Sequence, residues 1–366
     1  MRGTSCAETE IFTTTAALPP DALALLDAPT PCDPAAALFA SRTWWDVVLS
    51  HAMPPGAEAC FVAVRSAGRI VALLPMMRSG RRLSSLTTPY TCAYTPLFAA
   101  GLDPSARVSA MAAFGRFTRS SGVVRLDSLA AAWDGLPALE AGARRAGLRT
   151  LRFAHFGNWR EDVAGLDWPD YLRGRPGALR ETIRRRLRRA ERLPLARFDL
   201  LMRPDQMDQA AEAFESVYRR SWKEAEPYPA FNVALMRAMA ATGLLRLGVW
   251  SIGAEPVAVQ LWVVTEGHAI VLKLAHDEAF KAHSPGTVLT ALMLRHLLDN
   301  EHVRRIDFGR GDDAYKQDWA TERRQHIGVL LVNPWRPSGL LALARHGIGR
   351  VRTALRGGGS VRVAAD

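Results

Sequence analysis

The residues with the strongest chemical potential lie at 307–319, which read Asp-Phe-Gly-Arg-Gly-Asp-Asp-Ala-Tyr-Lys-Gln-Asp-Trp. Four carboxylates, two glycines and a lysine follow a short apolar segment, 305–308. Burial in that segment would raise the pKa of Asp307, which suits a base that accepts a proton from an amine. The positive charge of Lys316 could stabilise the oxyanion that forms when a nucleophile attacks an acyl carbonyl. We predict both as catalytic residues, the alternative being that they satisfy loop backbone groups or form ion pairs.

A second stretch, residues 281–287 (Lys-Ala-His-Ser-Pro-Gly-Thr), ends an extended segment and begins a helical one. Free backbone N–H groups and the helix dipole make such a helix start able to hold a phosphate. Ser284 is suited to cap the helix, and Pro285 is suited to its first turn. Gly286, which has no side chain, would let a ligand approach the backbone closely. An ordinary strand-to-helix turn is the alternative. The predicted donor-binding residues are Lys281, Ser284, Gly286 and Thr287.

Several other chemistries are not supported by the spacing of these residues. Gly309 and Gly311 lack the third glycine of a dinucleotide fingerprint, and the adjacent Asp312 and Asp313 would repel a pyrophosphate. The aspartates do not have calcium-loop spacing, and no histidines stand four residues apart as metal ligands, so no metal is predicted. No serine or cysteine has the context of an activated nucleophile, which favours direct transfer without a covalent intermediate.

Composition favours a two-domain globular protein with anionic partners. The 366 residues are 48% hydrophobic and carry a net charge of +11. A basic excess attracts nucleic acid, lipid headgroups or cofactor phosphates. Seven arginines and two glutamates fall within 180–192, a segment with the pattern of an amphipathic helix. The four cysteines form no Cys-x-x-Cys pair, and no signal peptide or membrane-spanning run is present, so a reduced cytoplasmic setting is expected.

The pattern of the chain predicts a mixed α and β structure in two halves. Strands are expected at 59–65, 70–77, 83–86, 123–126, 196–202, 244–250, 256–264, 269–275, 304–308 and 327–332. Helices are expected from 41 to before 54 and at 109–120, 136–146, 180–192, 204–222, 231–241, 287–300 and 337–355. Residues 64–72 and 249–258 share the pattern of a hairpin, which indicates two related halves or a coincidence of turn chemistry.

The second half resembles the acetyltransferase-like domain of the GNAT superfamily found in CelD-type and FemAB-like proteins. The resemblance lies in the order and spacing of five features of the chain. These are Ile183-Arg-Arg-Arg-Leu-Arg-Arg, Trp222 after a long helix, Gly-x-x-Pro-Val-Ala at 253–258, Ser284-Pro-Gly286, and Asp307-Phe-Gly-x-Gly-Asp312 followed by Tyr315-Lys-x-x-Trp319. The phosphate loop departs from the usual Arg/Gln-x-x-Gly-x-Gly/Ala pattern, because only one glycine is present.

This resemblance implies an α+β GNAT-like mixed sheet flanked by helices, in two tandem domains. The expected parts are a partly disordered extension (1–40), an N-terminal GNAT-like domain (41–168), an arginine-rich linker helix (169–195), a GNAT acyltransferase domain (196–335) and a basic tail (336–366). Tyr315, Trp319 and Trp222 are the candidate substrate contacts, although packing roles also fit them.

The implied activity is transfer of an acyl group, acetyl from acetyl-CoA, to an amine or hydroxyl of a small molecule or glycan precursor. One alternative is a FemAB-like transferase that takes its acyl group from aminoacyl-tRNA and acts on a cell-wall or polysaccharide precursor. Another is a non-catalytic GNAT-like module that binds RNA or an anionic membrane through the arginine-rich helix and basic tail. Salt-dependent RNA binding without thiol release would favour the last.

Overall fold

The structure, a computed structural model, describes residues 7–27 and 34–346. The elements of the N-terminal half are β1 (Glu8–Phe12), η1 (Thr15–Ala17), α1 (Pro20–Asp27), α2 (Pro34–Ala40), α3 (Arg42–His51), β2 (Ala57–Ser66), β3 (Arg69–Ser79), β4 (Arg82–Ser85), β5 (Leu97–Phe98), α4 (Pro104–Thr118), η2 (Arg119–Ser121), β6 (Val123–Ala130), α5 (Leu136–Arg145) and β7 (Arg149–Asp162). Those of the C-terminal half are α6 (Trp168–Arg173), α7 (Gly177–Glu191), β8 (Ala196–Leu201), η3 (Pro204–Gln206), α8 (Met207–Arg219), α9 (Phe231–Ala241), β9 (Leu245–Ile252), β10 (Glu255–Thr265), β11 (His268–His276), η4 (Glu278–His283), α10 (Pro285–Asp299), β12 (Arg305–Arg310), α11 (Lys316–Trp319) and β13 (Glu322–Val332).

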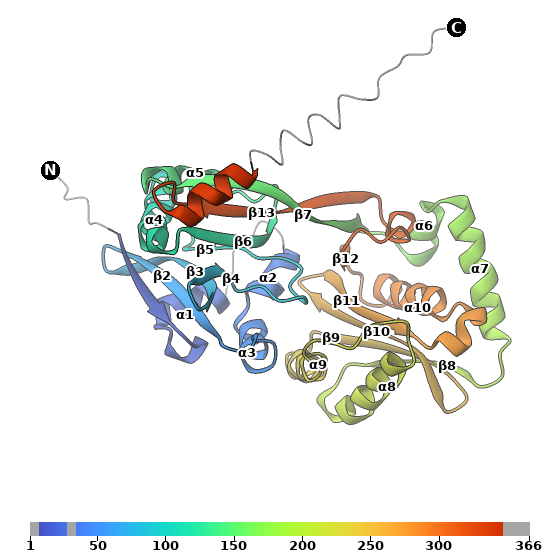
Figure 1. Cartoon of the computed structure of the whole chain (residues 1–366). Coiled ribbons are helices and arrows are strands. Elements are labelled where there is room, and N and C mark those ends of the chain that lie inside the picture. The colour runs from blue at the N-terminus through green and yellow to red at the C-terminus, as the bar shows by residue number, and fades with distance from the viewer. Residues whose placement is uncertain (1–6, 28–33, 347–366) are drawn as a thin grey trace, which may run out of the picture.

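One mixed sheet runs through both halves and is covered by helices (Figure 1). Its strand order is β1-β2-β3-β4-β6-β13-β7-β12-β11-β10-β9-β8, with β5 beside β3. The predicted mixed sheet flanked by helices is therefore confirmed. Among the described residues, no helix is both long and apolar enough to cross a membrane.

The two halves repeat one chain order. Each contains three antiparallel strands joined in sequence (β2–β4 and β9–β11), then a helix (α4 and α10), then a strand parallel to the third (β6 and β12). A parallel neighbour requires a crossover connection, which the helix provides. The hairpins with similar sequence, within 64–72 and 249–258, are the β2–β3 and β9–β10 turns, at corresponding positions of the repeat.

The halves also exchange strands at the middle of the sheet. β13 follows the C-terminal half in sequence but lies between β6 and β7, where Val332 is opposite both Val123 and Arg149. The end of β7 in turn pairs with β12, with Asp162 opposite Arg305. β7 and β13 cross from one half to the other along the top of Figure 1. The expected domain of residues 196–335 is thus not self-contained, since its last strand completes the sheet of the other half.

Two segments differ from the sequence predictions. Within the expected extension, β1 pairs with β2, and Ala22 and Leu26 of α1 are fully buried, so residues 7–27 belong to the fold. The long strand β7 was not predicted, because charged side chains interrupt its apolar positions. Among them, Arg160 pairs with Glu322 of β13, and Glu161 pairs with Arg175, which follows α6. Residues 1–6, 28–33 and 347–366 lie outside the described residues, as does the end of the predicted helix 337–355.

The arginine-rich helix α7 is part of the C-terminal core as well as a connection. Ile183 is fully buried and Ala190 is 8% exposed, in one cluster with apolar residues of α10. Arg184, Arg185 and Arg188 are exposed on the outer side. The helix thus has one face fixed by apolar packing and one face rich in unburied positive charge.

Candidate active site

The candidate site is a cleft where the sheet opens between β11 and β12. These strands pair in parallel only from His268 opposite Arg305 to Ile270 opposite Asp307. Beyond that point lies a cavity of about 400 Å³ that residues of both halves line. Its polar and aromatic lining includes Trp44, Tyr90, Cys92, Trp222, Lys223, Lys273, Arg310, Asp313, Tyr315 and Lys316. The parting of two sheet strands therefore creates a hollow that a substrate can enter without breaking the core.

One end of this region is the start of α10. Ser284 has a left-handed backbone conformation (φ 54°), and its side chain makes no capping hydrogen bond, unlike the predicted serine cap. The first-turn amides of Gly286 and Thr287 have no intrahelical acceptor, because an α-helix offers none there. Gly286 is fixed from the other side, where its carbonyl accepts hydrogen bonds from Gln260 and Thr290. Two of the predicted donor-binding residues, Gly286 and Thr287, thus present uncapped amides at a helix N-terminus.

Trp222 and His276 lie between this helix start and the cavity. Their rings contact with centroids 4.4 Å apart, and a Cβ atom added to Gly286 would lie 3.4 Å from His276 Nδ1. Burial lowers the pKa of His276, which favours the neutral ring. Trp222 is 49% exposed and lines the cavity; its role as a substrate contact remains a prediction. Lys281, on η4, is exposed and forms an ion pair with Glu278 at 3.5 Å.

Lys316 is a buried cation in the wall of the cavity, with 3% of its surface exposed. Its Nζ donates to the carbonyl oxygens of Arg310 (2.8 Å) and Gly311 (3.3 Å), and lies 3.0 Å from Asp313 Oδ2. These contacts hold the ammonium group in one place at the end of β12. A buried, fixed positive charge next to a cavity can stabilise negative charge that develops on a substrate.

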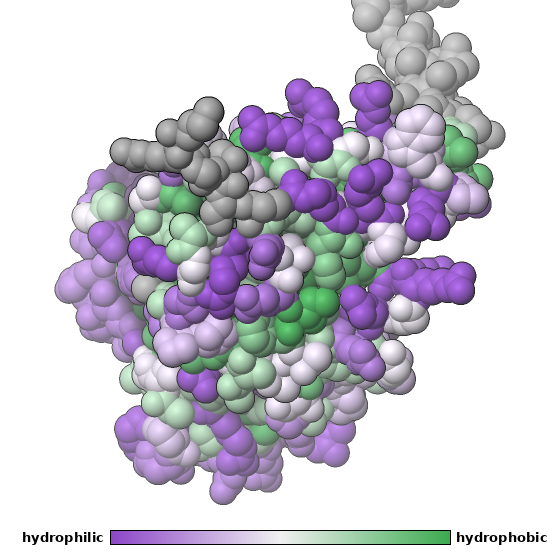
Figure 2. All heavy atoms as spheres, turned by 90° about the vertical axis from the view of Figure 1, so that its left-hand side faces the viewer, coloured by the Kyte–Doolittle hydropathy of each residue, from purple (hydrophilic) through white to green (hydrophobic). Residues whose placement is uncertain are grey.

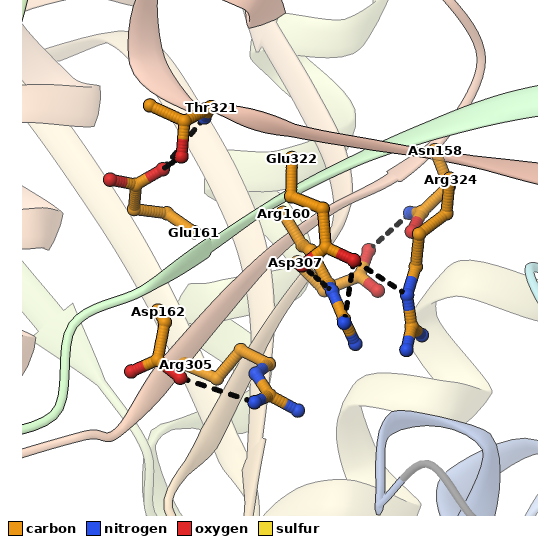
Figure 3. A network of polar contacts seen from close by, with 9 residues as sticks. All are labelled: Asn158, Arg160, Glu161, Asp162, Arg305, Asp307, Thr321, Glu322 and Arg324. Carbon is orange, nitrogen blue, oxygen red and sulfur yellow. Dashed lines mark hydrogen bonds and ion pairs between the residues drawn. The ribbon is translucent and has the colours of Figure 1, made fainter.

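Asp307 lies on the opposite face of β12 from Phe308. Its Oδ1 accepts hydrogen bonds from Asn158 Nδ2 (2.6 Å) and the Gly309 amide (2.7 Å). It lines a second cavity of about 420 Å³, together with Arg160, Glu322 and Arg324. Figure 3 shows these side chains grouped where β7, β12 and β13 meet. This geometry favours a role in holding the strands and the Gly309 turn; its predicted role as a base remains a prediction.

Replacing Asp307 by Ala is expected to lower the free energy of unfolding by about 1–3 kcal/mol, because the buried Asn158 amide loses one of its two acceptors and the Gly309 N–H loses its bond to Oδ1. Asp162→Ala is the control, since that carboxylate is 65% exposed in a surface pair with Arg305 and should change stability by less than about 1 kcal/mol. Urea unfolding measures both. An Asp307→Asn protein of normal stability but greatly reduced transferase activity would instead support Asp307 as the base.

The comparisons with known proteins agree with this geometry. Residues 177–317 match the profile of the family described as Acetyltransferase (GNAT) domain, which spans α7, the sheet opening and α10. Residues 177–317 thus belong to the GNAT superfamily. No curated protein matches the sequence.

Solved structures extend the likeness to the whole chain. FemX superimposes with a TM-score of 0.57 at 10% identity, covering 88% of this chain and 98% of FemX. A tandem GNAT protein from the clavulanic acid biosynthesis pathway gives 0.51 at 14% identity, covering 89% of this chain and 98% of that protein. L-PGS from Bacillus licheniformis gives 0.51 at 12% identity, covering 82% and 94%. At these identities the likeness establishes the fold, which is a tandem GNAT-like arrangement.

The corresponding helix of the N-terminal GNAT-like half begins differently. Asp103 caps α4, and its Oδ1 accepts hydrogen bonds from the amides of Ser105 and Ala106, both at 2.9 Å. These bonds lower the pKa of Asp103 and keep it charged. A carboxylate occupies the position where a phosphate would sit, so the two halves are not equivalent as anion sites. Of these two corresponding helices, α10 is the one that begins without a side-chain cap.

Two predicted substrate contacts, Tyr315 and Trp319, differ in their surroundings. Tyr315 lines the cavity and is 39% exposed, and burial together with Asp313 raises the pKa of its hydroxyl. Trp319 is 4% exposed within the C-terminal core. Its carbonyl accepts hydrogen bonds from Tyr171 and Arg175. This burial favours a packing role for the Trp319 indole; its predicted role as a substrate contact remains a prediction.

A polar cluster around Glu226 was missed by the sequence analysis. Glu226 Oε1 accepts hydrogen bonds from Lys273 of β11 and from Tyr218 of α8. Tyr90, from the N-terminal half, lies beneath Lys273, whose Nζ is 4.7 Å from the ring centroid. Burial alone would raise the pKa of Glu226, but the hydrogen bonds from Lys273 and Tyr218 outweigh it and lower the pKa. The cluster joins both halves at the cleft, and its members are too far apart in sequence to form a motif.

Glu226→Gln is expected to lower the free energy of unfolding at pH 7 by about 1–3 kcal/mol, because a charged acceptor of Lys273 is lost. The folded-state pKa of Glu226 lies below its ordinary value of 4.5, so its contribution is present above that value and fades as the pH falls through the folded-state pKa. Urea unfolding at a series of pH values should show the two proteins converging in acid. Glu224→Gln, an exposed neighbour on the same loop, should stay parallel to the wild type throughout.

Among the described residues, no group of three or more His, Cys, Asp and Glu side chains is arranged to hold a metal ion. The aspartates of the 307–319 stretch have other partners. Asp312 pairs with Arg323 and accepts a hydrogen bond from Trp159, and Asp313 pairs with Lys316.

Proposed function

We propose that the protein is an acyltransferase that moves an acetyl group from acetyl-CoA directly to an amine or hydroxyl acceptor. The observation that carries the proposal is the combination, within one GNAT domain, of a buried lysine in the wall of an open cavity and an uncapped helix start, which His276 and the cavity residue Trp222 connect to that cavity. The helix start suits the donor pyrophosphate, and the cleft suits the acyl group and acceptor.

In this reaction the acceptor nitrogen attacks the thioester carbonyl carbon as a neutral amine. The carbonyl oxygen becomes an oxyanion next to Lys316 Nζ, whose longest hydrogen bond, 3.3 Å to Gly311 O, is the one that the oxyanion would replace. The C–S bond then breaks, the amide forms, and the proton lost by the nitrogen passes to a base or solvent while the CoA thiolate takes up a proton. Trp222 and Tyr315 are the proposed walls for the substrates.

Direct transfer is favoured over a covalent intermediate by the state of a thiol in the wall of the cleft. Cys92 lines the main cavity. Burial, together with the charge of Asp307, raises its pKa to about 12, so the thiol stays protonated near neutral pH. A protonated thiol is a poor nucleophile.

The second candidate is transfer of an aminoacyl group from tRNA to a cell-wall or polysaccharide precursor, as the FemAB-like resemblance implies. One observation favours it: Arg189 of α7 donates to the carbonyl of Ala282 at 3.4 Å, in η4 just before the start of α10. A row of arginines beside a phosphate site suits a polyanion larger than CoA. A non-catalytic module that binds RNA through α7 is the third candidate.

A ligand screen distinguishes the three. The full chain is mixed with acetyl-CoA, longer acyl-CoAs or aminoacyl-tRNA, and the shift in melting temperature is measured alongside release of free thiol. Stabilisation by acyl-CoA, with thiol release once an amine acceptor is added, supports the leading proposal. Stabilisation by charged tRNA alone supports the second, and salt-sensitive binding of uncharged RNA without any transfer supports the third. An unchanged melting temperature with every CoA species would refute the leading proposal.

A further inference from the structure

A group of exposed apolar side chains marks the segment that follows β13. Trp335 is 81% exposed, Leu340 58% and Leu341 52%. They are three of the seven large hydrophobic side chains exposed among the described residues, and they fall within seven positions of the chain. Water-facing tryptophan and leucine in such a group usually mark an interaction surface.

These side chains are held on the surface by a fixed backbone. Asn333 is 5% exposed. Its backbone N–H donates to Gly122 O (2.8 Å), and its side-chain Nδ2 donates to Arg119 O (2.9 Å). Its Oδ1 accepts from the Trp335 amide at 3.0 Å. The helical residues that follow begin in close contact with the backbone of Asn333 and Gly122. A Cβ atom added to Gly339 would lie only 1.9 Å from Asn333 O and 3.3 Å from Gly122 O. The apolar side chains therefore point outward because the helix start is locked.

Positive charge surrounds the apolar group. Arg336 and Arg345 lie one helical turn from Leu340 and Leu341 respectively, and both are exposed. Arg119 and Arg149 lie next to Asn333, through the bond to Arg119 O and the pairing of Arg149 with Val332. None of these four arginines forms an ion pair with a described residue. Residues 336–366 contain six arginines and a single acidic residue.

Space-filling representation shows the same combination. In Figure 2, green apolar atoms at the upper right of the face are bordered by purple hydrophilic side chains. In Figure 1 this helix lies on the N-terminal half beside α4 and α5, away from the cleft between β11 and β12. A partner on this surface would leave the entrance of the candidate active site uncovered.

We propose that this surface, formed by Trp335, Leu340, Leu341, Arg336 and Arg345, docks the protein on an anionic lipid bilayer. Amphipathic helices with basic and aromatic or leucine side chains bind at the boundary between headgroups and acyl chains. The arginines attract anionic headgroups, and the three apolar side chains insert below them. Nucleic acid fits less well, because its phosphates accept the arginines but give the two leucines no apolar environment.

Co-sedimentation of the full chain with vesicles tests the proposal. We expect binding to vesicles of equal parts phosphatidylcholine and phosphatidylglycerol, weakened by salt, and little binding to phosphatidylcholine alone. The triple variant Trp335→Ala, Leu340→Ser, Leu341→Ser should reduce partitioning into the vesicles by about tenfold or more, since it removes the apolar contact that three large side chains make with the acyl chains. Its melting temperature should match that of the wild type, because the replaced side chains are exposed.

Two control variants locate the effect. Leu195→Ser removes another leucine that is 78% exposed, between α7 and β8, and should bind vesicles as the wild type does. Arg336→Glu with Arg345→Glu should abolish the preference for anionic vesicles, whereas Arg197→Glu on β8 should not. Equal binding by the triple variant and the wild type would overturn the proposal. So would RNA binding without vesicle binding, or a dimer in solution that the triple variant dissociates.

Discussion

Replacing Lys316 by Met is expected to lower kcat/KM for acyl transfer by about 100-fold or more. Loss of a fixed donor that faces the developing oxyanion has an effect of this size in other acyl-transfer enzymes. Methionine has a similar volume and no charge, so the wall of the cavity is kept. Thiol release from acyl-CoA in the presence of an amine acceptor measures the rate. Donor binding should persist, because the predicted phosphate site is on α10 and Lys316 is on α11.

The structural role of Lys316 must be separated from its chemical role. Its loss leaves the carbonyls of Arg310 and Gly311 without the Nζ donor, which should lower the free energy of unfolding by about 1–3 kcal/mol. Asp313→Asn is the matched control, since it removes the ion pair and keeps both carbonyl contacts. We expect that variant to lose less than about tenfold in rate. A Lys316→Met protein with near-normal kcat would refute the oxyanion role.

Gly286→Glu is expected to abolish the stabilisation of the protein by acyl-CoA. The added carboxylate would stand at the first turn of α10, where it repels a pyrophosphate and competes for the same amides. The substitution should be compatible with folding, since Gly286 does not have a positive φ and the nearest atom to a new Cβ is His276 Nδ1, at 3.4 Å. An acid in the first turn also favours the helix itself. A thermal shift assay with and without acyl-CoA measures the effect.

Gly286→Ala is the control for space without charge. It should retain most of the donor-induced shift, so a complete loss with Ala would indicate a steric effect and not repulsion. If Gly286→Glu still binds acyl-CoA with unchanged affinity, the donor phosphates do not sit at α10. Arginine variants of α7 that abolish tRNA binding without affecting acyl-CoA would then direct attention to the second candidate function.

Turns and helix starts could be predicted from the sequence, because they depend on residues that are neighbours in the chain. The turn residues at 66–69 and 251–255 predicted two hairpins, and Ser284, Pro285 and Gly286 predicted a helix start, all of which the structure contains. The order of the motifs in the second half was sufficient to indicate the GNAT superfamily, which the match at 177–317 confirms.

Contacts between segments that are far apart in the sequence could not be predicted from local sequence patterns. Glu226, Lys273 and Tyr90 meet only because the two halves close on one cleft, and nothing in their local sequence marks them. Trp319 stands beside the site in sequence, yet its side chain turns into the core, since short helical segments send successive side chains in different directions.

The sequence by itself determined the α+β class and the positions of its main turns and helix starts, and it indicated the related halves through one shared hairpin pattern, because propensity, turn chemistry and periodicity are local properties. Only the tertiary structure decided that β13 and β7 exchange between halves, that Asp307 holds a turn beside Asn158, and that Asp103 fills the helix start of α4 while Ser284 leaves that of α10 open. Strand partners and side-chain direction depend on packing across the whole sheet, in which a single added strand changes the environment of every neighbour.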